Sequence, residues 1–175
     1  MRAVLEDQAR RRCLRSSGRL RALRGSPFVT PRNPEGIERM RAGFDRQGVM
    51  RTLGVEIEEV SPGRVSLLLP FDADFTQHHG FLHAGIVTTV MDSAAGFAAF
   101  TLMEADAEVL TAEFKASFLA PARGTRFRMV GEVIKPGRTL TFCEARAYTL
   151  GEREVLFATL TATMMAVRDR PSVRS

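Results

Sequence analysis

Residues 83–103 read HAGIVTTVMDSAAGFAAFTLM, and this stretch decides the fold. It contains no proline, is almost wholly apolar and is long enough for about five to six helical turns. A helix that is apolar all round is usually buried. Small residues at positions 94–96 and 98–99 would let neighbouring elements approach its backbone closely. We therefore expect a long central helix with other elements packed around it.

Strand-like runs lie on both sides of this helix. Two of them, residues 52–60 and 64–71, are separated by the turn Ser61-Pro62-Gly63 and predict a β-hairpin. Four more follow the helix, at residues 108–121, 125–135, 139–150 and 154–167. The order β-β-α-β-β-β-β predicts an α+β fold in which a strongly curved antiparallel sheet wraps one long central helix.

The charge of the chain divides it into unequal parts. Residues 1–34 hold nine Arg against Glu6 and Asp7, which gives 9 − 2 = +7 and leaves 5 − 7 = −2 for residues 35–175. We expect a basic, poorly ordered extension over 1–34; a mitochondrial presequence and a start codon assigned too far upstream are alternatives. Nucleic-acid binding is not expected, because the extension's only aromatic residue is Phe28.

The remaining chain is expected to form one domain over residues 35–168, followed by a tail over 169–175. The domain should open with one short helix, because Ile37, Met40 and Phe44 recur at a spacing near 3.6. No apolar run approaches the roughly 18 to 20 residues that cross a bilayer, and no secretory signal is evident. With two cysteines and no disulfide framework, a cytoplasmic protein without membrane contact is expected.

Asp92 is the informative residue of the apolar helix. An ionised carboxylate buried in an apolar interior must be paired, hydrogen-bonded or neutralised, and no Lys or Arg occurs between residues 65 and 114. A cleft reached by water or substrate would resolve this conflict and give Asp92 a catalytic role. Alternatively, Asp92 could cap a new helix after a break in the run, or bond to backbone of a neighbouring strand.

The start of the same helix carries a second candidate group. Unpaired N–H groups at Ala84 and Gly85, behind His83, could hold developing negative charge as an oxyanion hole, and the Gln77 amide could orient a carbonyl or a water. Ala84 and Asp92 are eight residues apart, which is about 12 Å of helix rise. One reacting carbonyl cannot lie close to both. We therefore expect a dimer with two shared sites, formed by antiparallel packing of the central helices.

The three histidines His78, His79 and His83 raise the possibility of a metal site. No acidic or Cys ligand lies near enough in the sequence to complete one, so no metal is expected and His83 is assigned to shaping the loop. The absence of a G-x-S-x-G elbow and of a P-loop lysine disfavours serine hydrolase and nucleotide chemistry.

The spacing Gln77-x5-His83-Ala84-Gly85-x6-Asp92-x3-Gly96 resembles the signature of hotdog thioesterases of the phenylacetate-degradation (PaaI-like) type. The resemblance covers about residues 48 to 168. It implies the hotdog fold, a dimer or tetramer, hydrolysis of acyl-CoA thioesters without a cofactor, and Asp92 as nucleophile or general base. It also implies that Thr111 lies near the attacking water. Where the family commonly reads His-Gly-Gly, this chain has Ala84.

Further residues are expected to contact the CoA and acyl parts of the substrate. Lys135 and Arg138 flank the turn at Gly137 and are expected to meet the phosphates of CoA, with Arg123 and Arg126 as lesser candidates. Together with His83 and Gly96 they complete the predicted substrate contacts. The acyl pocket is assigned to apolar residues that are equally well explained as core, namely Phe97, Phe100, Met103 and Phe114.

Two rival functions use the same fold. A hydroxyacyl dehydratase would pair His83 with a carboxylate, but His83 and Asp92 are nine residues apart and face about 180° apart on one helix. A noncatalytic acyl-CoA-binding regulator would use the domain as a sensor. Retention of both Asp92 and Gln77 favours catalysis.

Overall fold

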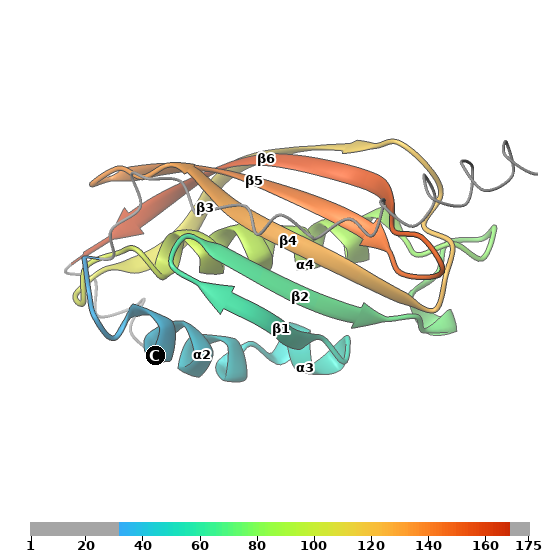
Figure 1. Cartoon of the computed structure of the whole chain (residues 1–175), viewed down its shortest axis with the longest axis horizontal. Coiled ribbons are helices and arrows are strands. Elements are labelled where there is room, and N and C mark those ends of the chain that lie inside the picture. The colour runs from blue at the N-terminus through green and yellow to red at the C-terminus, as the bar shows by residue number, and fades with distance from the viewer. Residues whose placement is uncertain (1–31, 169–175) are drawn as a thin grey trace, which may run out of the picture.

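The computed structural model of the chain describes residues 32–168 (Figure 1). The expected basic extension lies outside the described residues except for its last three positions, and the expected tail over 169–175 lies wholly outside them.

Six strands form one antiparallel sheet in the order β1-β2-β4-β5-β6-β3. Their bounds are β1 Glu56–Ser61, β2 Arg64–Pro70, β3 Glu108–Phe118, β4 Arg126–Lys135, β5 Leu140–Thr149 and β6 Val155–Val167. The predicted hairpin is confirmed, with Gly63 at a positive φ of 76° in its turn. All six predicted strands are present, and β1 and β3 are the two edges.

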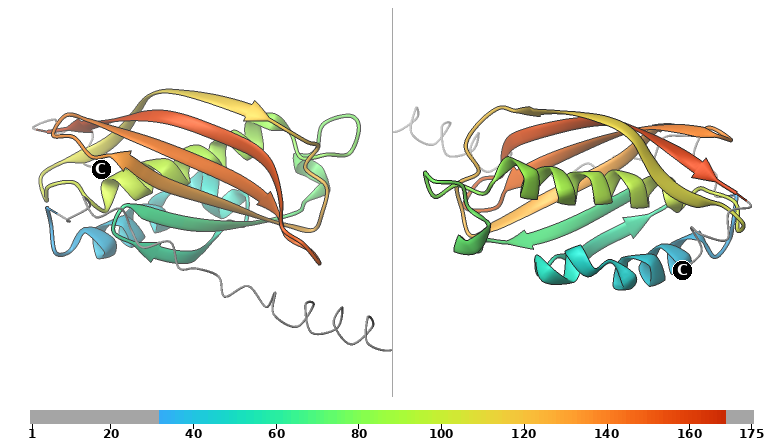
Figure 2. Two further views of the ribbon diagram at one scale, coloured as in Figure 1. Left: turned by 45° about the horizontal axis from the view of Figure 1, so that its top comes forward. Right: turned by 180° about the vertical axis from the view of Figure 1, so that it is seen from behind.

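The central helix α4, Ala84–Phe100, crosses the concave face of this sheet (Figures 1 and 2). The predicted helix is therefore confirmed but shorter than expected at its end. The N–H groups of Leu102 and Met103 bond to the carbonyls of Ala99 and Phe100, at the three-residue spacing that tightens and ends a last turn. The helix continues unbroken through Asp92, so the alternative of a break and a new cap there is wrong.

Small residues allow close contact between α4 and the sheet. A Cβ placed on Gly131 of β4 would lie 2.3 Å from the backbone carbonyl of Ala94, so a side chain there would force the helix away. All seven residues from Ala94 to Phe100 are buried. The predicted role of the small residues in the second half of the helix is confirmed.

The N-terminal helices differ from the prediction. Two helices, α2 Gly36–Arg46 and α3 Gly48–Thr52, replace the single expected one, because Gln47 adopts an extended conformation (φ −72°, ψ 102°) between them. The strand expected from Thr52 begins only at Glu56. Helix α2 packs against α4, and Gly36 is required there because a Cβ would lie 2.4 Å from the Thr101 carbonyl oxygen.

The resulting molecule has the α+β hotdog architecture that was expected. Seen from behind, α4 lies on the open side of the sheet (Figure 2), where α2 packs against its second half through Phe44 and Phe97. Its first half is accordingly partly exposed, from Ala84 to Ser93, although Val87, Val90 and Met91 face the core. Among residues 32–168, none of the helices reaches the length and apolarity of a membrane span.

Candidate active site

A short loop positions Gln77 beside the start of α4. The Gln77 N–H donates to the Phe81 carbonyl at 2.8 Å, and the Gly80 N–H donates to the Gln77 carbonyl at 2.8 Å, with Gly80 at φ 79°. The Gln77 side-chain oxygen accepts from the His79 N–H. Within the described chain, its NH₂ group bonds to no protein acceptor. Gln77 can therefore donate to a carbonyl or a water in front of the helix.

The N-terminus of α4 leaves one N–H available. His83 caps the helix, since its Nδ1 accepts from the Gly85 N–H at 2.9 Å, and its carbonyl accepts from Ile86 and Val87. A Cβ on Gly85 would lie 3.0 Å from that Nδ1, so a side chain there would press on the capping imidazole and shift it by a few tenths of an ångström. Only the Ala84 N–H among these lacks an acceptor within residues 32–168. Of the two predicted oxyanion donors, the geometry favours Ala84 over Gly85.

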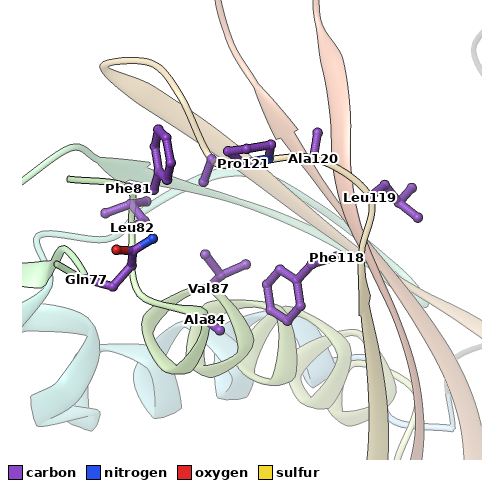
Figure 3. Close-up of a pocket in the computed structure, with 10 residues that line it drawn as sticks. Gln77, Phe81, Leu82, Ala84, Val87, Phe118, Leu119, Ala120 and Pro121 are labelled. Carbon is purple, nitrogen blue, oxygen red and sulfur yellow. The ribbon is translucent and has the colours of Figure 1, made fainter. Parts of the chain in front are cut away.

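A cavity of about 510 Å³ lies at this end of α4, with Ala84 in its lining (Figure 3). Gln77, Phe81 and Ala84 line one side, and Phe118 together with the segment from Leu119 to Ala122 lines the other. The walls are mostly apolar, with Gln77 as the polar side chain. Such a cavity suits a ligand with a mainly apolar body and one polar group near the helix start.

Asp92 lies two turns further along α4, partly buried and beside the edge strand. Its carboxylate accepts a hydrogen bond from the Thr111 hydroxyl of β3 at 2.8 Å. Burial raises the pKa of Asp92, and the Thr111 hydrogen bond opposes this rise. No described Lys or Arg forms an ion pair with it. Asp92 is thus a carboxylate in an apolar helix, held by one hydroxyl and biased toward accepting a proton.

The two groups do not meet within one chain. Asp92 does not line the cavity in front of Ala84, and about 12 Å of helix rise separates the two residues. The structure brings Gln77, His83 and Ala84 together at one end of α4, and Asp92 and Thr111 together near its middle.

The predicted phosphate-binding turn lies elsewhere. Lys135 and Arg138 flank the β4–β5 hairpin, which is at the far end of the sheet from the cavity, about 30 Å along a ten-residue strand. Gly137 is explained by the turn itself, because a Cβ would lie 1.9 Å from the Leu140 carbonyl oxygen. These three residues cannot share a site with Gln77 and Ala84 of the same chain.

Other predicted residues occupy structural positions. Gly96 is buried in α4 near Met164, so packing rather than substrate contact explains it. Three of the residues assigned to the acyl pocket, Phe97, Phe100 and Met103, are buried core and do not line the cavity. The structure replaces them with the wall from Phe118 to Ala122, which the sequence interpretation missed. An apolar run continuing past a strand end, Phe118-Leu119-Ala120, is the signal that could have revealed it.

Two other kinds of potentially reactive side chain lie in the described residues, the histidines of the loop before α4 and Cys143. His78 and His79 lie with ring centroids 3.9 Å apart, and within residues 32–168 no group of three His, Cys, Asp or Glu side chains could hold a metal ion. Cys143 is buried in β5, where burial raises the pKa of its thiol to about 12. Such a thiol is not a nucleophile at neutral pH.

Comparison with known sequences identifies related proteins. A sequence profile of the thioesterase superfamily matches residues 79–156. A Saccharolobus solfataricus protein, provisionally named an esterase, is 32% identical over 55% of this chain and 68% of its own. The 1,4-dihydroxy-2-naphthoyl-CoA hydrolase of Listeria monocytogenes is 27% identical over 57% of this chain and 80% of its own.

Solved structures also include a protein of the thioesterase family. A thioesterase family protein from Silicibacter pomeroyi is 55% identical, covers 77% of this chain and 99% of its own, and superposes with a TM-score of 0.75. The E. coli PaaI protein of the phenylacetic acid degradation operon shares the fold at 13% identity, covering 76% of this chain and 94% of its own, with a TM-score of 0.69. The chain belongs to the thioesterase superfamily, whose general chemistry is thioester hydrolysis.

Proposed function

We propose that this protein hydrolyses acyl-CoA thioesters to a free acid and CoA, at sites shared between two copies of the chain. The observation that carries the proposal is Asp92, a partly buried carboxylate bonded to Thr111 and lacking a cationic partner in the described chain. It lies on the same helix as the available Ala84 N–H. No cofactor is needed for this chemistry.

Each group has a defined part in the reaction. The Ala84 N–H, strengthened by the helix dipole, donates to the thioester oxygen as negative charge develops there. The Gln77 NH₂ group orients that carbonyl or the water. Asp92 either removes a proton from water as the water attacks, or attacks the carbonyl carbon itself to form an anhydride that water then cleaves. In both routes the carbon–sulfur bond breaks and CoA leaves as a thiolate that takes up a proton.

The geometry of β3 supports the dimer. Within residues 32–168 this edge strand has no partner on its outer side, and its side chains Phe114 and Phe118, on the same face of the sheet as α4, are 45% and 47% exposed. Unpaired, apolar edge strands favour pairing with another chain. Antiparallel pairing of two β3 strands would set two α4 helices side by side in opposite directions. Asp92 of one copy would then lie toward the Ala84 cavity of the other.

The same arrangement would bring the β4–β5 hairpin of one copy toward the cavity of the other. Lys135, Gly137 and Arg138 lie beyond the C-terminal end of α4, which in an antiparallel pair faces the N-terminal end of the partner helix. The CoA contacts predicted for this turn are thus retained as part of the proposal only between copies. The Listeria relative, named for a CoA thioester substrate, supports CoA as the leaving group.

Thiol release from a panel of acyl-CoAs tests the proposal, with short, medium and aromatic acyl groups and wild type compared with Asp92→Asn in the same oligomeric state. We expect turnover on at least one member and a loss of at least ~100-fold in kcat/KM for the variant. Asn keeps the size of the side chain and an acceptor for Thr111, so a loss would report on the charge. Tight acyl-CoA binding without turnover by wild type would instead support a noncatalytic regulator.

A further inference from the structure

Arg123 lies at the cavity on a segment that the proposed mechanism does not use. It follows Ala122 in the connection between β3 and β4, and this connection forms one wall of the cavity (Figure 3). Its guanidinium carbon is 4.4 Å from the ring centroid of Phe81, which lines the opposite side. The cation thus lies over an aromatic ring that lines the cavity, next in sequence to the lining residue Ala122.

The contact with Phe81 leaves the hydrogen-bond donors of Arg123 unused, since within residues 32–168 they bond to no protein acceptor. A guanidinium carries five N–H donors in one plane. Arg126, three residues later, pairs with Glu56 at 3.6 Å, and Arg128 with Glu58 and Glu154. Among residues 32–168, Arg123 forms no ion pair. A positive charge without a counterion therefore stands beside an apolar cavity.

We propose that Arg123 binds an anionic group of the substrate beside the cavity, next to Phe81. The planar donors match the geometry of a phosphate or a carboxylate. The anion has two possible sources, a phosphate of the CoA part or a carboxylate at the far end of the acyl chain. This inference rests on the proposed function, since the cavity is the one that receives the thioester.

Arg123→Gln and Arg126→Gln form a matched pair of variants. Both remove one positive charge from the same region, but Arg126 is the first residue of β4, does not contact the lining residue Phe81 and already has a carboxylate partner. Each variant is assayed on four thioesters: an acyl-CoA with a neutral acyl group, an acyl-CoA ending in a carboxylate, and the N-acetylcysteamine thioester of each acyl group. The cysteamine thioesters carry no phosphate.

We expect Arg123→Gln to raise KM by at least about 10-fold with little change in kcat, because the lost contact serves ground state and transition state equally. A rise in KM confined to the two CoA thioesters identifies a phosphate of CoA as the bound anion. A rise in KM confined to the two substrates that end in a carboxylate identifies the carboxylate of the acyl chain. Arg126→Gln should stay within about two-fold of wild type on all four. An unchanged KM for Arg123→Gln on every substrate that wild type hydrolyses would overturn the inference.

A second measurement separates this inference from the proposed function. If wild type hydrolyses none of the four compounds, the proposed function fails, and the dissociation constants of the two acyl-CoAs are compared by calorimetry for wild type and Arg123→Gln. Binding weakened at least about 10-fold would still support the anion contact. Equal binding by both proteins, or none by either, would overturn it.

Discussion

The two halves of α4 show how one helix serves two purposes. From Ala84 to Ser93 the helix keeps an exposed side, and its donors and acceptors include Asp92 and the Ala84 N–H. From Ala94 to Phe100 every residue is buried, and β4 approaches the backbone so closely that Gly131 can carry no side chain. The second half anchors the helix, and this lets the first half hold polar groups without being covered.

Ala84→Pro removes the available N–H from the first half of α4, and it has the largest expected effect on activity. Proline is favoured at the first position of a helix, and His83 before it already has the extended conformation that proline requires (φ −63°, ψ 138°). The helix should therefore persist while the N–H is removed. We expect kcat/KM for acyl-CoA hydrolysis to fall by about 100- to 1000-fold, as for the loss of one oxyanion donor.

Ala84→Val is the control for this variant, because it adds similar volume to the cavity but keeps the N–H. Its loss in kcat/KM should be clearly smaller on short acyl groups. Equal losses for the two variants would mean that cavity volume, and not the N–H, decides the rate.

Mixing two inactive variants sharpens the comparison between the helix start and Asp92. If each site combines Ala84 of one copy with Asp92 of the other, a dimer of Ala84→Pro with Asp92→Asn contains one intact site and one doubly altered site. Random mixing makes half of the dimers mixed, each with half of the sites intact, so activity should recover to about one quarter of wild type (0.5 × 0.5). Refolding the two variants together and measuring thiol release tests this. A mixture no more active than its parts would place both groups in one chain.

Gly131→Ala and Gly96→Ala probe the second half of the helix from its two sides. A Cβ at Gly131 would lie 2.3 Å from the Ala94 backbone, whereas one at Gly96 would lie 3.9 Å from the Met164 sulfur, an ordinary contact. We expect Gly131→Ala to lower the free energy of unfolding by about 3 kcal/mol, from overpacking. Gly96→Ala should leave it unchanged or raise it by up to about 1 kcal/mol, because alanine favours the helix.

Thermal unfolding of both glycine variants measures these differences, and thiol release from the Gly96→Ala variant adds a second result. A fall of more than about two-fold in its kcat/KM would support the substrate contact that the family signature implied, against the packing role that its burial indicates.

The sequence predicted most of what depends on local pattern. The apolar run, the Ser61-Pro62-Gly63 turn and the alternating strands each determine structure from neighbouring residues, and all are present as expected. The error between residues 47 and 55 also has a local cause. The extended conformation of Gln47 breaks the helix without a proline, and the sequence has no strong signal for α3.

The candidate site was predictable where its members share one element or belong to the family signature, which includes Gln77 and Asp92. Ala84 and Asp92 could be compared because helix geometry fixes their separation. The cavity wall from Phe118 and the stack of Arg123 on Phe81 arise where the end of β3 meets the loop before α4, about 40 residues away in sequence. The same tertiary geometry places Arg138 at the end of the sheet that lies far from the cavity of its own chain.

Thr111→Val has a smaller expected effect on rate than the changes at Ala84 and Asp92, and it tests the electrostatics of the exposed half. The Thr111 hydrogen bond lowers the pKa of Asp92, whereas burial raises it, so removing the hydroxyl should raise the pKa further. Because the ionised carboxylate is the active form, kcat/KM falls as pH drops through this pKa, and the acidic limb of the pH profile should move to higher pH. Above the limb, the loss should be only several-fold. Thr111→Ser keeps the hydroxyl and should retain the wild-type limb, so a limb that is the same in all three proteins would mean that it does not report the ionisation of Asp92.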